Sequence, residues 1–269
     1  MERRQPSTSR FEGIQALRGI AAILVLMFHA AGYEQLLPIG REWQSLQSFS
    51  WHGFAGVDLF FVISGFIIAW SSHSEIGNPQ RLPRYALRRF NRIMPMYWLC
   101  WFASAWVIYV LFADNLPVAP ERLVGESVKS LLLVARDAHF VIPQAWTLNY
   151  EVVFYAVFGL FILLPRSLVA PGLVAWAALV VASSIGVLPR VWPLSFYSLL
   201  FIAGAVIGLV ARRTRLPVPL SMLLLGICTW VAAAALIANG VLLRADELHE
   251  VAGFGLASAL IVYGGPDWI

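Results

Sequence analysis

Hydrophobic positions along the chain form long continuous runs and do not alternate with polar positions. Eight stretches of about twenty mainly apolar residues, the length needed to cross a bilayer, are separated by short polar segments. The predicted spans cover residues 14–32, 54–72, 93–113, 147–164, 169–187, 193–211, 219–239 and 251–266. The pattern therefore predicts an all-α fold, a polytopic transmembrane helical bundle of about eight spans.

The composition agrees with a membrane protein. Hydrophobic residues make up 59% of the chain and charged residues 13%, well below the roughly 25% charged residues of soluble domains. No polar stretch is long enough for a separate soluble domain, so residues 1–269 are expected to form a single integral-membrane domain. The basic opening MERRQPSTSRFEG leads into an apolar run without a small-residue cleavage site, which predicts a retained first span.

Basic residues favour one orientation of the bundle. With the N-terminus in the cytoplasm, thirteen of the nineteen lysines and arginines lie on the cytoplasmic side and six lie outside. Segment 120–142 affects this count, because it carries many charges around a short apolar core, SLLLVA. Treating it as a span would move Arg166 and the RRTR cluster outside. We expect an outer loop with an interfacial or re-entrant helix there.

Two kinds of site are not expected. The arginines flank hydrophobic spans and do not form a stripe, so no nucleic-acid partner is predicted despite the net charge of +4. Cys100 and Cys228 each lie in an apolar run without a neighbouring cysteine or histidine, which argues against a metal site or a disulfide.

Four strongly ionisable residues fall inside the predicted spans, where burial is costly: Arg18, His29, Asp58 and Glu151. Arg18 and His29 are eleven residues apart, so they share one helical face and lie roughly 16 Å apart along the axis. Counting along the spans places His29, Asp58 and Glu151 at one level, roughly 7 to 9 Å outside the midplane, with Arg18 on the cytoplasmic side. Three titratable groups at one level indicate a site.

Each of these residues also has a structural interpretation. His29 is compatible with a hydrogen bond between helices, and Asp58 with a cap or salt bridge at the start of its helix. Glu151 is harder to explain structurally, because a carboxylate one turn inside a span needs a partner or a proton. Aromatic side chains near the outer mouth are suited to stacking on sugars or to an interfacial belt. They are Trp43, Trp51 and Trp146.

Four arginines in RYALRRFNRIMP, just before the third predicted span, form a second cluster. Arg89 and Arg92 are three residues apart and share a helical face, with Arg84 and Arg88 nearby. Membrane topology alone explains such a cluster. The alternative is an anion site that includes Arg18, because guanidinium groups bind phosphates bidentately.

These motifs occur in a recognisable order. Arg18 followed after ten residues by His29, then GVDLFFVISGFII, RRFNRIMPMYW and AWTLNYEVVFY, resembles the membrane acyltransferase-3 family over about residues 12–160. The resemblance is closest to exopolysaccharide O-acetyltransferases of the succinoglycan type. It implies an enzyme of the bacterial inner membrane that moves an acyl group, usually acetyl, from coenzyme A to a sugar hydroxyl.

The resemblance and the charge pattern together imply roles for individual residues. Acyl-CoA is expected as a co-substrate, with no permanently bound cofactor, and a glycan or lipid-linked sugar as acceptor within the membrane lipids. His29 is expected to act as general base or acyl carrier, with Glu151 orienting its ring. The remaining residues divide into a donor-binding group, Arg18, Arg89 and Arg92, and a supporting group, Asp58, Trp146, Asn149 and Tyr150.

Two other functions remain open at this stage. In a transporter, His29, Asp58 and Glu151 would relay protons or ions while the arginines set topology. In a truncated, inactive family member, the membrane domain would persist without acyl transfer. Family members usually have about ten helices, whereas this sequence ends at IVYGGPDWI, near the end of the eighth predicted span, so we expect a short variant or a truncated member.

Overall fold

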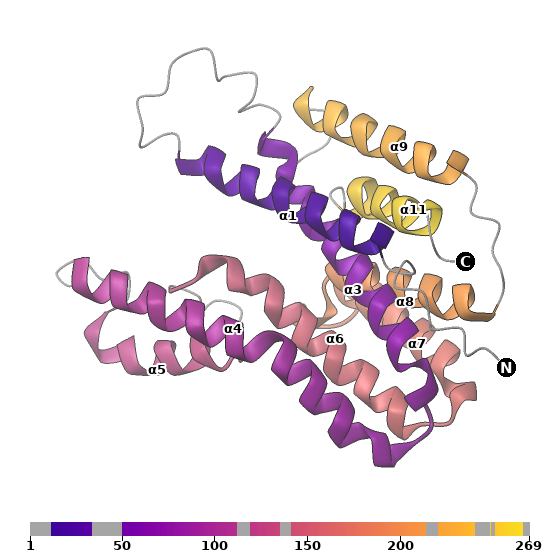
Figure 1. The fold of residues 1–269 in the computed structure, drawn as a ribbon, viewed down its shortest axis with the longest axis horizontal. Coiled ribbons are helices and arrows are strands. Elements are labelled where there is room, and N and C mark those ends of the chain that lie inside the picture. The colour runs from indigo at the N-terminus through magenta and orange to yellow at the C-terminus, as the bar shows by residue number, and fades with distance from the viewer. Residues whose placement is uncertain are drawn as a thin grey trace, which may run out of the picture.

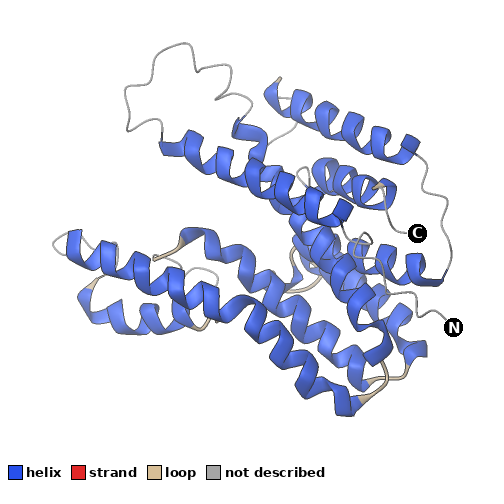
Figure 2. Ribbon diagram, viewed as in Figure 1, coloured by secondary structure: helices blue, strands red, loops and turns tan. Residues whose placement is uncertain are grey.

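The computed structural model describes residues 12–33, 50–111, 119–134, 141–213, 220–239, 248 and 251–265. Within these residues the chain is helical, and no strand occurs (Figure 2). The principal helices are α1 (Glu12–Tyr33), α3 (Gly56–Ser72), α4 (Leu82–Leu111), α5 (Pro120–Leu131), α6 (Trp146–Leu163), α7 (Val169–Ser184), α8 (Tyr197–Arg213), α9 (Leu220–Ala238) and α11 (Leu256–Gly264). Single turns η4 (Trp51–Ala55), η5 (His73–Glu75), η6 (Pro79–Arg81), η8 (Pro143–Ala145), η9 (Arg166–Leu168), η10 (Trp192–Leu194) and η11 (Val251–Gly255) connect or extend them.

The all-α transmembrane bundle predicted from hydropathy is confirmed. Six helical segments in the described part of the chain are long and apolar enough to cross a membrane, and two shorter apolar helices lie at Tyr197–Arg212 and Val251–Gly264. Each of the eight predicted spans overlaps one of these segments. The chain is therefore a multi-pass membrane protein.

Helix α4 extends beyond the start of the third predicted span. Helix α4 begins at Leu82, not near residue 93, so Pro95 lies inside the helix and the arginine cluster lies on its first turns. Arginine is a good helix former, so the helix can begin within the arginine cluster. Two of the arginine side chains are also bonded to residues at the end of α3 and in η5. Arg88 pairs with Glu75 at 2.6 Å, and Arg89 donates a hydrogen bond to Ser71 at 3.0 Å.

The charged segment after α4 forms a short helix, as predicted. Helix α5 is twelve residues long and lies beside the second half of α4 (Figure 1). Tyr97 Oη donates to the Ser130 carbonyl at 2.6 Å, and Trp101 Nε1 donates to Ser130 Oγ at 2.9 Å. These bonds dock the end of α5 onto α4. The depth of α5 in the bilayer stays a prediction.

Helix α3 is the centre of the bundle and packs between α1 and α8 (Figure 1). Its contact with α8 brings the two backbones together through small residues, as is common between membrane helices. A Cβ atom built on Gly65 would lie 2.1 Å from the Phe201 carbonyl oxygen, and one on Gly204 would lie 1.9 Å from that of Val62. No larger side chain fits at either position without moving a helix.

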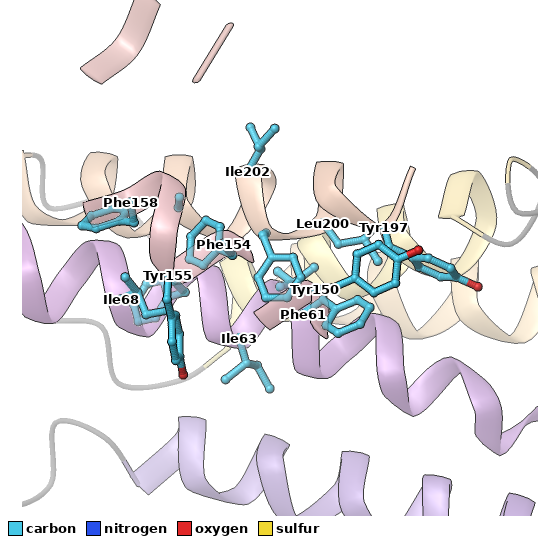
Figure 3. Packing of buried hydrophobic residues seen from close by; sticks show 14 of the residues in the cluster. Phe61, Ile63, Ile68, Tyr150, Phe154, Tyr155, Phe158, Tyr197, Leu200 and Ile202 are labelled. Atoms are coloured by element: carbon cyan, nitrogen blue, oxygen red, sulfur yellow. The ribbon is translucent and has the colours of Figure 1, made fainter. Parts of the chain in front are cut away.

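Aromatic rings fix α6 against α3 and α8. Phe61 of α3 and Phe154 of α6 both contact Phe201 of α8, with ring centroids 4.6 Å and 4.8 Å away. Figure 3 shows this cluster and shows the Tyr155 ring pointing away from the Phe154 and Phe158 rings. The cluster thus holds one face of α6 and leaves another face, with Tyr155, for different contacts.

Candidate active site

A cavity of about 580 Å³ lies between α1, α3, α4 and α6. Its apolar wall includes Val25, Phe28, Val57 and Phe60. Its polar lining includes side chains from helices that are distant in sequence: Arg18, His29, Ser64, Arg92, Gln144, Thr147 and Glu151. The fold therefore gathers charged groups from α1, α4 and α6 around one space.

Helix α1 contributes Arg18 and His29 to this lining. Both side chains are half-buried, and Val25 and Phe28 line the cavity between them. Arg18 lies close enough to Arg92 and Glu151 for their charges to act on it. The cavity is thus charged around Arg18, three helical turns before His29.

Glu151 of α6 is held by two hydroxyl groups. Tyr155 Oη, one helical turn later, donates a hydrogen bond to Glu151 Oε1, and Ser64 Oγ of α3 lies 3.5 Å from the same oxygen. Ser64 follows Asp58 by six residues, or roughly 9 Å along α3. The α3 residue that meets the Glu151 carboxylate is thus Ser64, and the common depth of His29, Asp58 and Glu151 in the bilayer stays a prediction.

His29 and Glu151 line the same cavity but are not bonded to each other. Among the described residues, Glu151 accepts hydrogen bonds from Tyr155 and Ser64, and none joins it to His29. The His29 ring makes an edge contact with Phe28, at a centroid distance of 5.2 Å. A direct carboxylate-histidine pair, as expected from the sequence, is absent from this part of the structure.

The paired arginines of α4 lie in different environments. Arg92 is half-buried and lines the cavity. Arg89 is buried and lies outside the cavity lining, where it donates hydrogen bonds to Ser71 Oγ at 3.0 Å and Ser72 Oγ at 3.2 Å. Its guanidinium group also lies over two tyrosine rings, 5.3 Å from Tyr85 and 5.6 Å from Tyr155.

The predicted supporting residues are also divided. Trp146 lines the cavity. Asn149 and Tyr150 are buried on α6, where the Tyr150 ring packs on Tyr197, and Asp58 is fully buried in the first turn of α3. The structure thus brings five of the nine predicted site residues to the cavity and places the other four in the packing around it.

The remaining aromatic and sulfur-containing candidates have distinct positions. Trp51 of η4 packs edge-on against Phe28, and Trp43 lies outside the described residues. Cys100 and Cys228 are both unpaired and exposed, and Cys100 lines the cavity. The described residues contain no cluster of three or more histidine, cysteine or acidic side chains placed to hold a metal ion.

Two residues at the site were not predicted from the sequence, Tyr155 and Ser64. Both lie in motifs already noted, Tyr155 at the end of AWTLNYEVVFY and Ser64 within GVDLFFVISGFII. Tyr155 follows Glu151 by four residues, the spacing at which helical side chains meet. That spacing was the available signal for Tyr155. Nothing in the sequence indicated that Ser64 faces Glu151.

A family model described as an acyltransferase domain matches residues 11–266. The chain belongs to this family. This match confirms the family resemblance that was drawn from Arg18, His29 and the motifs on α3, α4 and α6.

Three proteins with descriptive names are similar to this chain. The chain is 34% identical to exopolysaccharide production protein ExoZ of Rhizobium meliloti, over 61% of this chain and 53% of ExoZ. It is 26% identical to acyltransferase MdmB of Streptomyces mycarofaciens, over 69% of this chain and 48% of MdmB. Peptidoglycan O-acetyltransferase OatA of Listeria monocytogenes is 27% identical, over 55% of this chain and 20% of OatA.

The matched region covers about half the length of ExoZ and of MdmB. No solved structure matches this chain.

Proposed function

We propose that this protein is a membrane O-acyltransferase that transfers an acyl group, acetyl by preference, from acyl-CoA to a hydroxyl of an exopolysaccharide or another cell-surface glycan. The observation that carries the proposal is the joint position of Arg18, Arg92 and His29 around one cavity in an acyltransferase-family chain. The names of ExoZ and OatA support the type of acceptor and the acetyl group.

The arginine end of the cavity suits the donor. Arg18 and Arg92 outnumber Glu151, so this part of the lining carries excess positive charge. Neither arginine forms a hydrogen bond or ion pair with another described residue, which leaves both available to a ligand. Coenzyme A is polyanionic at its nucleotide end, and guanidinium groups bind phosphate oxygens bidentately.

His29 is suited to act at the other end of the donor. Its distance from Arg18, roughly 16 Å along α1, leaves room for the extended pantetheine arm along the apolar wall. In the proposed step, the acceptor hydroxyl oxygen attacks the thioester carbonyl while neutral His29 takes the hydroxyl proton. A carbon–oxygen bond forms, the carbon–sulfur bond breaks, and the imidazolium returns its proton to the departing thiolate. Free coenzyme A and the acyl ester are the products.

The orientation follows from the same assignment. We place the protein in the bacterial inner membrane with its N-terminus in the cytoplasm, where acyl-CoA is made. Arg18 lies near the start of α1, so this orientation turns the arginine end of the cavity toward the donor. The start of α1 and the end of α11 lie toward the same end of the molecule (Figure 1), as an even number of crossings requires.

The direct test is the O-acetyl content of surface polysaccharide, measured by proton NMR in a deletion strain that expresses this chain. We expect the intact chain to restore the acetyl signal and His29→Ala to abolish it at matched membrane abundance. His52→Gln is the control, because His52 is another half-exposed histidine nearby that does not line the cavity. Equal acetylation with and without His29 would contradict the proposed chemistry.

A further inference from the structure

Glu151 lines the cavity with two groups of opposite charge but forms no ion pair with either. Its charge acts on Arg18, and Arg92 lines the same space, yet among the described residues no ion pair joins Glu151 to Arg18 or Arg92. Carboxylate and guanidinium groups pair readily when both are partly withdrawn from water. Another contact must therefore hold the Glu151 carboxylate away from Arg18 and Arg92.

Tyr155 supplies that restraint. Its hydroxyl donates to Glu151 Oε1, and Ser64 Oγ lies near the same oxygen, so one edge of the carboxylate is turned toward these hydroxyls. Tyr155 itself is buried, at 7% exposure, on a helix that the aromatic cluster holds in place. The tyrosine therefore has little freedom to follow the carboxylate toward the arginines.

Arg89 braces the ring of Tyr155 from outside the cavity. The guanidinium lies over that ring at 5.6 Å and is fixed by Ser71 and Ser72 at the end of α3. Tyr85 closes the group, since its ring lies under the same guanidinium and its hydroxyl donates to the Tyr155 carbonyl at 3.0 Å. Three helices thus converge on Tyr155.

We propose that Tyr155 is a positioning residue that holds Glu151 away from Arg18 and Arg92 and so keeps both guanidinium groups open for the phosphates of the donor. Arg89 acts through Tyr155 and does not contact the donor. The inference rests on the proposed function, because it takes acyl-CoA as the anionic ligand. Without the tyrosine hydroxyl, Glu151 pairs with the arginines, and the donor must break that pair to bind.

Cys100 provides a binding assay that does not depend on turnover. It lines the cavity, whereas Cys228, the other cysteine of the chain, is exposed on α9 and serves as an internal reference. In the intact chain in detergent micelles, acetyl-CoA should slow maleimide modification of Cys100 and leave Cys228 unaffected. The acetyl-CoA concentration that gives half protection reports the apparent Kd of the donor.

We expect Tyr155→Phe to raise this apparent Kd on the order of 10-fold, the effect of a competing charge-assisted interaction. Tyr109→Phe is the matched control, because it also removes a partly buried tyrosine hydroxyl of the bundle, one bonded to Ser127 Oγ at 3.2 Å, but lies outside the cavity lining, and it should leave the Kd unchanged. In a Glu151→Gln background, Tyr155→Phe should have no further effect, because no carboxylate remains to compete.

Two results would overturn the positioning role: unchanged donor binding by Tyr155→Phe, or the same 10-fold loss when the substitution is made in Glu151→Gln. Protection of Cys100 in the intact chain distinguishes these results from a failure of the proposed function. If acetyl-CoA protects neither cysteine of the intact chain, the donor assignment is wrong, and the role of Tyr155 is withdrawn with it.

Discussion

Arg92 lines the central cavity, whereas Arg89, one helical turn earlier on α4, is buried outside it against the end of α3. Two arginines that form one motif in the sequence therefore have different surroundings. Arg92 is placed to contact a ligand, and Arg89 is placed to brace Tyr155 and join three helices.

Replacement of Arg92 should weaken donor binding selectively. Arg92→Gln removes one of the two guanidinium groups in the cavity lining, so we expect the KM for acyl-CoA to rise at least about 10-fold, as for loss of a charge-assisted phosphate contact. Arg84→Gln removes a charge from an exposed position on the same helix, outside the cavity lining, and should leave KM unchanged. Steady-state kinetics in proteoliposomes measures both, and equal KM values would contradict the role of Arg92.

Arg88 and Arg89 should differ in their effect on stability. The Arg88 side chain is 41% exposed in its pair with Glu75, so Arg88→Gln should cost less than about 1 kcal/mol. Arg89→Gln removes two hydrogen bonds and two ring contacts from a buried group, which should cost about 2 to 4 kcal/mol. In thermal unfolding of the detergent-solubilised variants, the Tm of Arg89→Gln should therefore be well below that of Arg88→Gln. The reverse order would contradict the role of Arg89 in holding Tyr155.

Close packing of α3 on α8 should tolerate no added methyl group. Gly204→Ala places a Cβ atom 1.9 Å from the Val62 carbonyl oxygen, so the helices must separate, with a loss of about 1 to 3 kcal/mol. Gly125→Ala on α5 meets nothing within 4 Å and should be neutral or slightly stabilising through helix propensity. The measurement is the fraction of each variant that remains monodisperse in detergent after heating. Equal fractions for Gly204→Ala and Gly125→Ala would show that the α3–α8 contact has room for a methyl group.

The attachment of α5 should depend on the indole of Trp101. Trp101→Phe keeps most of the ring packing but removes the hydrogen bond to Ser130 Oγ, which should weaken docking of α5 by about 1 kcal/mol. Amide hydrogen exchange should become faster in α5 and stay unchanged in α3. Phe102→Leu is the control, since Phe102 is 58% exposed on the same helix. If amide hydrogen exchange in α5 were equally fast in Trp101→Phe and Phe102→Leu, the indole of Trp101 would not be what attaches α5.

The sequence alone predicted the approximate positions of the apolar helices, because hydropathy over twenty residues is a local property. It also placed Arg18 and His29 on one face of one helix, where regular helical geometry fixes their spacing. The family motifs named Glu151 and Arg92, and both reach the cavity. Helix α4 begins eleven residues before the predicted span, because hydropathy registers only the apolar part of a helix.

Only the tertiary structure decided which of these groups meet. Ser64 and Tyr155 hold Glu151, and Arg89 lies outside the cavity that Arg92 lines. Each outcome depends on how far neighbouring helices are shifted and tilted along their axes. Those offsets are set by contacts between residues far apart in the chain, such as Gly204 on Val62 and Phe201 on Phe61, and no local pattern records them.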